Sequence, residues 1–152
     1  MKVECSYFVW CYDWVRRILY IDGSNLFGGM SELLRPGEYF DFNEFMDVVE
    51  TIFNIGTVKF YGTYRSGSSS DSVRRRSIIR AQYLFFNQAR SHSKVMFVKG
   101  YFGGYGKEKG VDMKMGVDLV KDAYEGAYDE AIVLSGDDDF IYAISSAKAT
   151  GK

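Results

Sequence analysis

Short apolar runs alternate with longer segments of helical spacing along this chain. The runs have the length and composition of strands and lie at residues 15–22, 56–64, 94–102 and 129–136. The longer segments have the periodicity of helices and lie at residues 40–53, 73–92, 111–127 and 139–151. Strands that are apolar throughout are buried on both faces. The alternation therefore predicts an α/β fold in which a parallel sheet is covered by helices on both faces.

The size and composition of the chain fit one such domain. Its 152 residues are enough to bury a single core, and 47% hydrophobic with 26% charged residues is ordinary for a globular domain. A formal net charge of -1 provides no bulk attraction to a polyanion. The cysteines are Cys5 and Cys11 and the one histidine is His92, so neither a disulfide scaffold nor a zinc site is predicted. A reducing, cytoplasmic setting fits this pattern.

Residues 1–14 form an aromatic N-terminal extension before the predicted domain at residues 15–152. Glu4 and Asp13 interrupt its apolar character and no small-residue cleavage site follows, so a signal peptide is not predicted. We expect an extra strand or an aromatic cap on the core, and docking to a membrane or a partner is the alternative. No stretch of the chain approaches the ~18 uncharged apolar residues of a membrane helix, so a membrane is not an expected partner.

Acidic residues follow two of the predicted strands. Asp22 ends the first strand in YIDGSN, and Asp137, Asp138 and Asp139 follow the last strand in IVLSGDDDF. Ligands of such sheets bind outside the carboxyl ends of the strands, so Asp22 and Asp137 are expected to face one crevice. Adjacent like charges there suggest a cation, and Mg²⁺ or Mn²⁺ prefers oxygen ligands, commonly one or two carboxylates with water. The alternative for the three aspartates is a solvated turn that caps the last helix.

Other polar residues near these strand ends are candidates for the same crevice. Asp112 stands near the start of a predicted helix, where a cap is the simpler role for a carboxylate. Asp118 lies roughly 120° around that helix from Asp112, so a supporting or ion-pairing role suits it as well as a direct one. Asn25, Ser24 and Ser135 could each orient a carboxylate, a water or a phosphate oxygen, although such residues are also common in turns.

Two other phosphate-binding patterns are excluded by the sequence. GGYGKEKG has Glu108 where a phosphate-binding loop requires Ser or Thr to hold Mg²⁺. A haloacid-dehalogenase-type phosphatase would need a second acid two residues after Asp22, where this chain has Ser24. His92, near the end of a predicted helix, is expected to have a structural role.

Three motifs occur in a fixed order: IDGSNL at the first strand, KGVDMKMGVDLV at a helix start and IVLSGDDDF after the last strand. Together they resemble the NYN domain, the LabA-like branch of the PIN-like nuclease superfamily, from about Val15 to the C-terminus. The resemblance implies a single Rossmann-like PIN/NYN domain with a metal-binding core. It implies that Asp22, Asp112 and Asp137 hold the metal, that Asp118 and Asp139 assist in catalysis, and that Asn25 and Ser135 shape the pocket, where Ser24 is a further candidate.

The resemblance also implies an activity. A metal-dependent ribonuclease of this kind would hydrolyse RNA phosphodiester bonds with metal-activated water and would use Mg²⁺ or Mn²⁺ as its cofactor. RNA as the partner rests on the resemblance alone. The alternative is a non-catalytic RNA-binding or regulatory protein on the same fold. PIN-like domains often pair, so a homodimer is a candidate assembly. The chain stops where a further strand would normally follow, so the sheet is expected to be either complete or short of its last strand.

RNA also requires a basic surface, and positive residues flank two loops at residues 65–72 and 101–110. Such residues position phosphates without reading sequence. The candidates for RNA binding are Arg65, Arg74, Arg75, Arg76, Arg80, Lys107 and Lys109, with Tyr64, Tyr101, Phe102 and Tyr105 as residues that could stack on unpaired bases. The alternative is a solvated arginine-rich helix face together with core aromatics.

Overall fold

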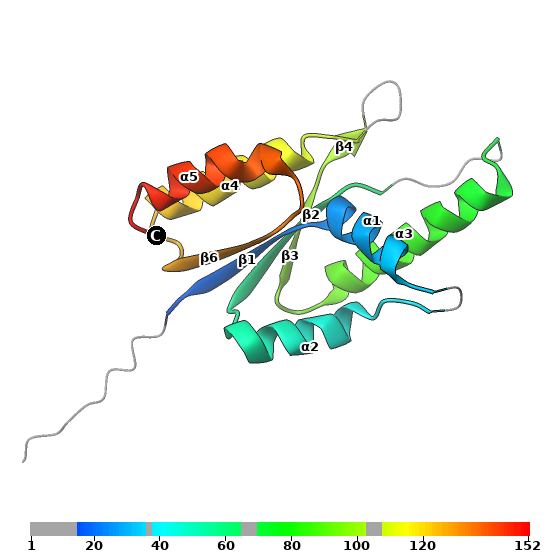
Figure 1. The fold of residues 1–152 in the computed structure, drawn as a ribbon, viewed down its shortest axis with the longest axis horizontal. Coiled ribbons are helices and arrows are strands. Elements are labelled where there is room, and N and C mark those ends of the chain that lie inside the picture. The colour runs from blue at the N-terminus through cyan, green and yellow to red at the C-terminus, as the bar shows by residue number, and fades with distance from the viewer. Residues whose placement is uncertain (1–14, 36–37, 65–69, 103–107) are drawn as a thin grey trace, which may run out of the picture.

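A central parallel sheet organises the computed structural model, which describes residues 15–35, 38–64, 70–102 and 108–152. The sheet has four strands in the order β3-β2-β1-β6, and every neighbouring pair is parallel. Their bounds are β1 Arg17–Asp22, β2 Thr57–Gly62, β3 Val95–Lys99 and β6 Glu130–Leu134. Five α-helices cover its two faces (Figure 1), which confirms the predicted α/β fold class. The N-terminal extension at residues 1–14 lies outside the described residues.

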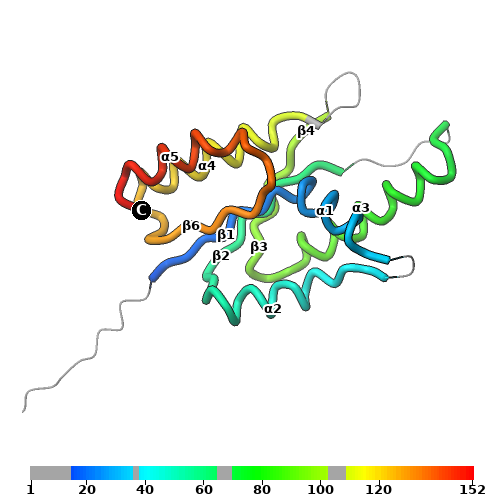
Figure 2. Tube along the Cα trace, in the orientation of Figure 1, coloured from blue at the N-terminus to red at the C-terminus, as the bar shows by residue number. Residues whose placement is uncertain are grey.

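The helices are divided between the two faces of the sheet. One face is covered by α1 (Gly23–Leu33), α2 (Phe42–Phe53) and α3 (Val73–Ser91), and the other by α4 (Val111–Tyr124) and α5 (Ile141–Lys148), as Figures 1 and 2 show. Alternate residues of β1 serve the two faces: Leu19 and Ile21 pack toward α1 to α3, whereas Ile18 and Tyr20 pack toward α4 and α5. This two-sided burial is the physical reason for the continuous apolar runs in the sequence.

Aromatic side chains fill the core between the sheet and α1 to α3. The Phe60 ring lies 5.7 Å from Phe42, 5.9 Å from Phe85 and 5.4 Å from Phe86, measured between ring centroids. These distances and the mostly edge-on arrangement are those preferred by aromatic pairs. Many of the aromatic residues that the structure describes thus pack inside the domain.

Side chains at the helix starts set where the helices begin. Asp41 caps α2 by accepting hydrogen bonds from the amides of Asn43 and Glu44, and the Ser72 hydroxyl accepts one from the Arg75 amide at the start of α3. At the other end of α2, Asn54 takes the left-handed conformation that closes a helix. These caps satisfy backbone groups that have no partner within the helix.

Helix α1 was not among the predicted helices, and the turn expected around Asn25 is its first turn. Glycines at positions 23, 28 and 29 lower the intrinsic helix propensity of this segment, which hid it from sequence patterns. The helix forms because Asp22 caps it and because Leu26 and Phe27 pack against the aromatic core. Tertiary packing therefore overrides a weak local preference.

The predicted strand at residues 94–102 is two elements in the structure. After β3, Gly100 turns the chain into β4 (Tyr101–Phe102), which pairs antiparallel with β5 (Glu108–Lys109) in a separate ribbon. After β6, a short 3-10 helix, η1 (Asp138–Phe140), leads into α5. Within the described residues the main sheet has four strands. No helix in that part of the chain has both the length and the apolarity to span a membrane.

Candidate active site at the carboxyl ends of the strands

The strand order places a topological switch point between β1 and β6. From β1 the chain passes through α1 and α2 to β2 and then on to β3, whereas β6 lies on the opposite side of β1. The chain leaves β1 toward one face of the sheet and leaves β6 toward the other (Figure 1), because α1 and α5 pack on opposite faces. In open α/β sheets this topological switch point is where ligands bind.

Asp22 ends β1 at this switch point. It is 4% exposed, and it caps α1 because its Oδ1 accepts a hydrogen bond from the Asn25 amide at 3.0 Å. Its Oδ2 accepts a second hydrogen bond, from the Ser135 hydroxyl at 3.0 Å. Two donors from different elements thus fix the orientation of a nearly buried carboxylate.

The turn after β6 supplies the other half of the site. The Asp137 amide donates to Ser135 Oγ at 3.1 Å, and the Gly136 amide donates to Asn25 Oδ1 at 2.9 Å. Ser135 therefore contacts both Asp22 and the backbone of Asp137, and Asn25 holds the turn from the opposite side. We call these five residues, Asp22, Asn25, Ser135, Gly136 and Asp137, the β1–β6 link.

Of two further predicted acids, Asp139 contacts the β1–β6 link and Asp112 shares a groove with Asp139. The Asp139 amide donates to Asp137 Oδ1 at 3.0 Å, so the turn continues directly from the link into η1. Asp112 lies in the first turn of α4, and Asp112 and Asp139 line one groove between α4 and α5. Gly110, in the left-handed conformation, stands at the N-cap position of α4, so Asp112 is not the cap residue.

Asp118 has a different environment from the other predicted acids. Its Oδ2 accepts a hydrogen bond from the Tyr61 hydroxyl at 2.8 Å, beneath α4 and against the sheet. Burial, together with this hydrogen bond, raises the pKa of the Tyr61 phenol. One turn further along, Asp122 accepts hydrogen bonds from Tyr20 and Lys59. The structure therefore places Asp118 in a network that holds α4 on the sheet.

Thr63 is a residue that the sequence did not single out. It follows β2 at the same edge of the sheet, is 2% exposed, and its hydroxyl is the one buried side-chain oxygen or nitrogen among the described residues that lacks a hydrogen-bond partner. It lies close to Gly100 and Val111. A polar residue directly after an apolar strand was the signal available in the sequence.

The donor atoms of the site are carboxylate, hydroxyl and amide oxygens, which suit hard cations. Within the described ranges, no three Asp, Glu, His or Cys side chains are grouped so that they could hold a metal ion. Oxygen atoms of these kinds are the ligands that Mg²⁺ or Mn²⁺ prefers when one or two carboxylates bind the ion and water fills the remaining positions.

The predicted basic residues lie mainly on α3. Arg74, Arg75, Arg76 and Arg80 are exposed on its first three turns, which extend beyond the sheet in Figure 1, and Arg75 pairs with Asp71 at 3.2 Å. Lys109 is exposed in β5. Arg65, Lys107 and Tyr105 lie outside the described residues. These positions form a basic surface along one helix and do not converge on the β1–β6 link.

The predicted stacking residues differ in exposure. Tyr101 and Phe102 are exposed in β4. Tyr64 is half-buried, accepts a hydrogen bond from Arg90 at 2.9 Å, and has the Lys99 ammonium 4.9 Å from its ring centroid. His92 packs edge-on against Phe42, and its Nδ1 accepts a hydrogen bond from the Lys94 amide. The contacts of His92 agree with the structural role predicted for it.

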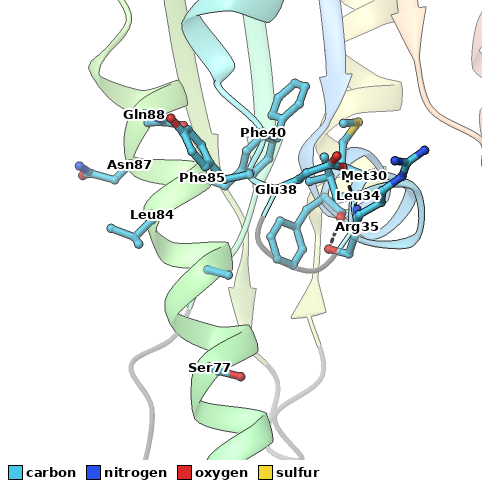
Figure 3. Close-up of a pocket in the computed structure, with 14 residues that line it drawn as sticks. Met30, Leu34, Arg35, Glu38, Phe40, Ser77, Leu84, Phe85, Asn87 and Gln88 are labelled. Atoms are coloured by element: carbon cyan, nitrogen blue, oxygen red, sulfur yellow. Dashed lines mark hydrogen bonds between the residues drawn. The ribbon is translucent and has the colours of Figure 1, made fainter.

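A separate cavity lies between α1 and α3. Its volume is about 880 Å³, and Figure 3 shows Met30, Leu34, Phe40, Leu84 and Phe85 among its lining residues. Phe40 and Phe85 lie 5.5 Å apart between ring centroids. None of the predicted site residues that the structure describes lines this cavity. Size alone therefore does not identify the functional site here.

The fold and the acids at the strand ends define a class of protein: a Rossmann-like α/β domain with acidic residues at its topological switch point. The family model of the NYN domain matches residues 16–152. The chain therefore belongs to the NYN domain family, which is part of the PIN-like nuclease superfamily. No curated protein and no solved structure matches it.

Proposed function

We propose that this NYN domain protein is a ribonuclease that depends on Mg²⁺ or Mn²⁺, with Asp22 and Asp137 as the residues that would bind the ion directly and Asp112 as the residue that would hold it through water. The observation that carries the proposal is the contact of one hydroxyl, Ser135 Oγ, with both the Asp22 carboxylate and the Asp137 amide. This contact links the Asp22 carboxylate to the backbone of Asp137, at the point where α/β sheets bind ligands.

A divalent ion at this site would neutralise the phosphodiester charge and activate water for attack. The chain's own task is to orient the acids. A carboxylate has about four lone-pair sites, so Asp22 retains acceptor capacity after its hydrogen bonds to Asn25 and Ser135. Because the Asn25 and Ser135 donors already hold the Asp22 carboxylate, that carboxylate needs little reorganisation as charge develops during the reaction.

The remaining predicted residues support the same proposal in different ways. Asp139 continues from the β1–β6 link and lines the α4–α5 groove with Asp112. Asp118 would act indirectly, because its bond to Tyr61 holds α4, and hence Asp112, against the sheet. Ser24 lies in the first turn of α1, two residues after Asp22. The arginines of α3 and Lys109 would bind phosphates of the RNA away from the cleaved bond.

The test is Mn²⁺-dependent cleavage of a labelled single-stranded RNA by the wild type and by Asp137→Asn. Asp138→Asn is the matched control, since Asp138 is the neighbouring exposed acid and is not part of the β1–β6 link. We expect cleavage by the wild type and the control and a large loss in Asp137→Asn with an unchanged melting temperature. Full activity of Asp137→Asn would contradict the proposed site.

A non-catalytic RNA-binding or regulatory protein is the second candidate. It is favoured by the finding that, among the described residues, no three metal-ligating side chains are grouped together. If no protein cleaves RNA, but Mn²⁺ raises the melting temperature of the wild type and not of Asp137→Asn, the ion is structural and this second function replaces the first. The LabA-like branch, a homodimer and a cytoplasmic location stay predictions from the sequence.

A further inference from the structure

Tyr61 joins the strand end that carries Asp22 to the helix that carries Asp112. The Cα atoms of Tyr61 and Asp22 are partners on the paired strands β2 and β1. The Tyr61 side chain is completely buried beneath α4, and its hydroxyl donates a hydrogen bond to Asp118 Oδ2 at 2.8 Å. Asp112 stands six residues before Asp118 on that helix, which is about 9 Å along the axis. Tyr61 therefore spans the space between two elements that each supply an acid to the site.

Hydrogen-bonded carboxylates occupy part of the side of α4 that faces the sheet. Asp118 is the first of them. One turn later, Asp122 accepts hydrogen bonds from Tyr20 and Lys59. Apolar packing, such as that of the buried Leu119, is not directional, whereas a hydrogen bond tolerates only a narrow range of distance and angle. The two carboxylates therefore determine the position of α4 on the sheet more closely than its apolar contacts do.

The two carboxylates differ in what remains when a tyrosine hydroxyl is removed. Asp122 keeps Lys59 Nζ at 2.5 Å if Tyr20 loses its hydroxyl. Tyr61 is the one hydrogen-bond donor that the described part of the chain supplies to the Asp118 side chain. The polar contact nearest to the N-terminal half of α4 thus depends on a single hydroxyl.

Asp112 and Asp118 have different surroundings on the same helix. Asp112 is exposed and lines the groove between α4 and α5 together with Asp139. Asp118 is half-buried, and its carboxylate lies against Tyr61 of the sheet. A carboxylate that is bonded from the sheet side orients its own helix, and it faces a different direction from the acid that lines the groove.

We propose that Tyr61 is a positioning residue of the metal site: through Asp118 it holds the N-terminal half of α4 so that Asp112 keeps its place relative to Asp22. This inference rests on the proposed function, and it assigns Asp118 the role of hydrogen-bond acceptor without direct contact to the ion. Mg²⁺ demands near-ideal octahedral geometry, and a binding site must be held within about 0.5 Å of its productive geometry. Loss of the Tyr61 hydroxyl therefore weakens binding of the ion, although Tyr61 does not touch it.

The experiment measures Mn²⁺ binding in the absence of RNA by isothermal titration calorimetry, with thermal melts of the same proteins. Tyr61→Phe is compared with the wild type and with Tyr20→Phe. The control is matched because Tyr20 is equally buried, its ring stacks on Tyr61 at 6.5 Å between centroids, and its hydroxyl also bonds to a carboxylate of α4. Both variants should melt at a lower temperature, since a carboxylate loses a donor in each. Only Tyr61→Phe should bind Mn²⁺ more weakly, by about tenfold, the lower end of the effect of removing a group that orients a ligand.

A second pair of variants separates the hydrogen bond of Asp118 from its charge. The side-chain oxygen in Asp118→Asn still accepts a hydrogen bond from the Tyr61 hydroxyl, whereas Asp118→Leu removes the acceptor. We expect Asp118→Leu to weaken Mn²⁺ binding as much as Tyr61→Phe does, and Asp118→Asn to weaken it less. An equal loss in Asp118→Asn and Asp118→Leu would show that the charge of Asp118 acts on the ion, and it would overturn the inference.

Three other results would overturn the inference: the same Mn²⁺ affinity in Tyr61→Phe as in the wild type, an equal loss in Tyr20→Phe, or no Mn²⁺ binding by the wild type. RNA cleavage is assayed separately. In Tyr61→Phe the Mn²⁺ concentration that gives half the maximal rate should rise about tenfold, with a smaller change in the maximal rate. Mn²⁺ binding that depends on Tyr61, without cleavage by the wild type, refutes the proposed ribonuclease and supports the positioning role. Cleavage with an unchanged Mn²⁺ requirement in Tyr61→Phe refutes only the positioning role.

Discussion

The Ser135 hydroxyl lies 3.0 Å from Asp22 Oδ2, and this hydrogen bond joins residues 113 positions apart in the sequence. The two residues follow paired strands, since Ile21 of β1 is in register with Leu134 of β6. The same hydroxyl accepts a hydrogen bond from the Asp137 amide. The orientation of Asp22 toward the turn after β6 therefore depends on one small side chain.

Ser135→Ala removes that contact without adding bulk. We expect RNA cleavage to fall by about 10- to 100-fold, the usual effect of losing a group that orients a metal ligand, and the melting temperature to fall as well, because the nearly buried Asp22 carboxylate loses a hydrogen-bond donor. Rate constants for RNA cleavage under single-turnover conditions measure the loss. Ser91→Ala is the control, because the Ser91 hydroxyl bonds to the Asn87 carbonyl within α3, away from the β1–β6 link. An unchanged rate in Ser135→Ala would show that the bridge does not position Asp22.

Gly23 and Gly28 of α1 form a matched pair of substitutions. A Cβ at Gly23 would lie 2.7 Å from the Tyr61 carbonyl oxygen and would also overlap the Phe60 ring, whereas a Cβ at Gly28 meets no atom within 4 Å. Because a backbone atom of β2 cannot move aside, Gly23→Ala should lower the free energy of unfolding by about 1–3 kcal/mol. Gly28→Ala should raise it by about 1 kcal/mol through helix propensity.

Urea denaturation of both glycine variants provides the measurement. The same destabilisation in Gly23→Ala and Gly28→Ala would contradict the steric argument. A Gly23→Ala variant that folds should also cleave RNA more slowly, since Gly23 directly follows Asp22 and begins the helix that Asp22 caps.

Lys59 provides the positive charge for Asp122 under α4. Lys59 Nζ lies 2.5 Å from Asp122 Oδ2, and their side chains are 15% and 11% exposed. Lys59→Met leaves a nearly buried carboxylate without its cation and should destabilise the domain by about 3–5 kcal/mol. Adding Asp122→Asn should recover much of this loss, because the charge is then absent. A double-mutant cycle of Lys59→Met and Asp122→Asn, measured by urea unfolding, gives the coupling energy between the two side chains. Additive losses of unfolding free energy would show that the two side chains are not coupled.

The buried tyrosines beneath α4 predict a loss of stability in alkali. Burial raises the pKa of Tyr20, Tyr61 and Tyr128 above the ordinary value near 10. The unfolded chain therefore loses these protons first. Their contribution to stability is fully present below about pH 10 and falls as the pH rises further.

Unfolding midpoints in urea across this pH range, together with phenolate absorbance, test the alkaline effect. Tyr61→Phe should be less stable near neutral pH, because Asp118 loses its hydrogen-bond donor. It should also show a smaller loss of stability above about pH 10. Titration of every tyrosine near its ordinary pKa in the folded protein would contradict the prediction.

Much of the architecture followed from local patterns. Continuous apolar runs indicated strands buried on both faces, and Asp22 and Asp137 were expected at strand ends from their places after such runs. Segments with weak local signals were missed. The glycines of α1 concealed a helix that depends on aromatic packing, and Gly100 divides a run that reads as one strand. Propensity is a weak guide where tertiary contacts decide.

The sequence by itself determined the α/β class, the strand-end acids and the family motifs, because these depend on periodicity and on residues close together along the chain. Only the tertiary structure decided that β6 pairs with β1, that Ser135 bridges Asp22 and Asp137, and that Asp118 faces Tyr61. It also decided that Asp112 and Asp139 share a groove with exposed tyrosines. The physical reason is that periodicity reports which faces are buried, whereas strand pairing depends on contacts between residues more than a hundred positions apart.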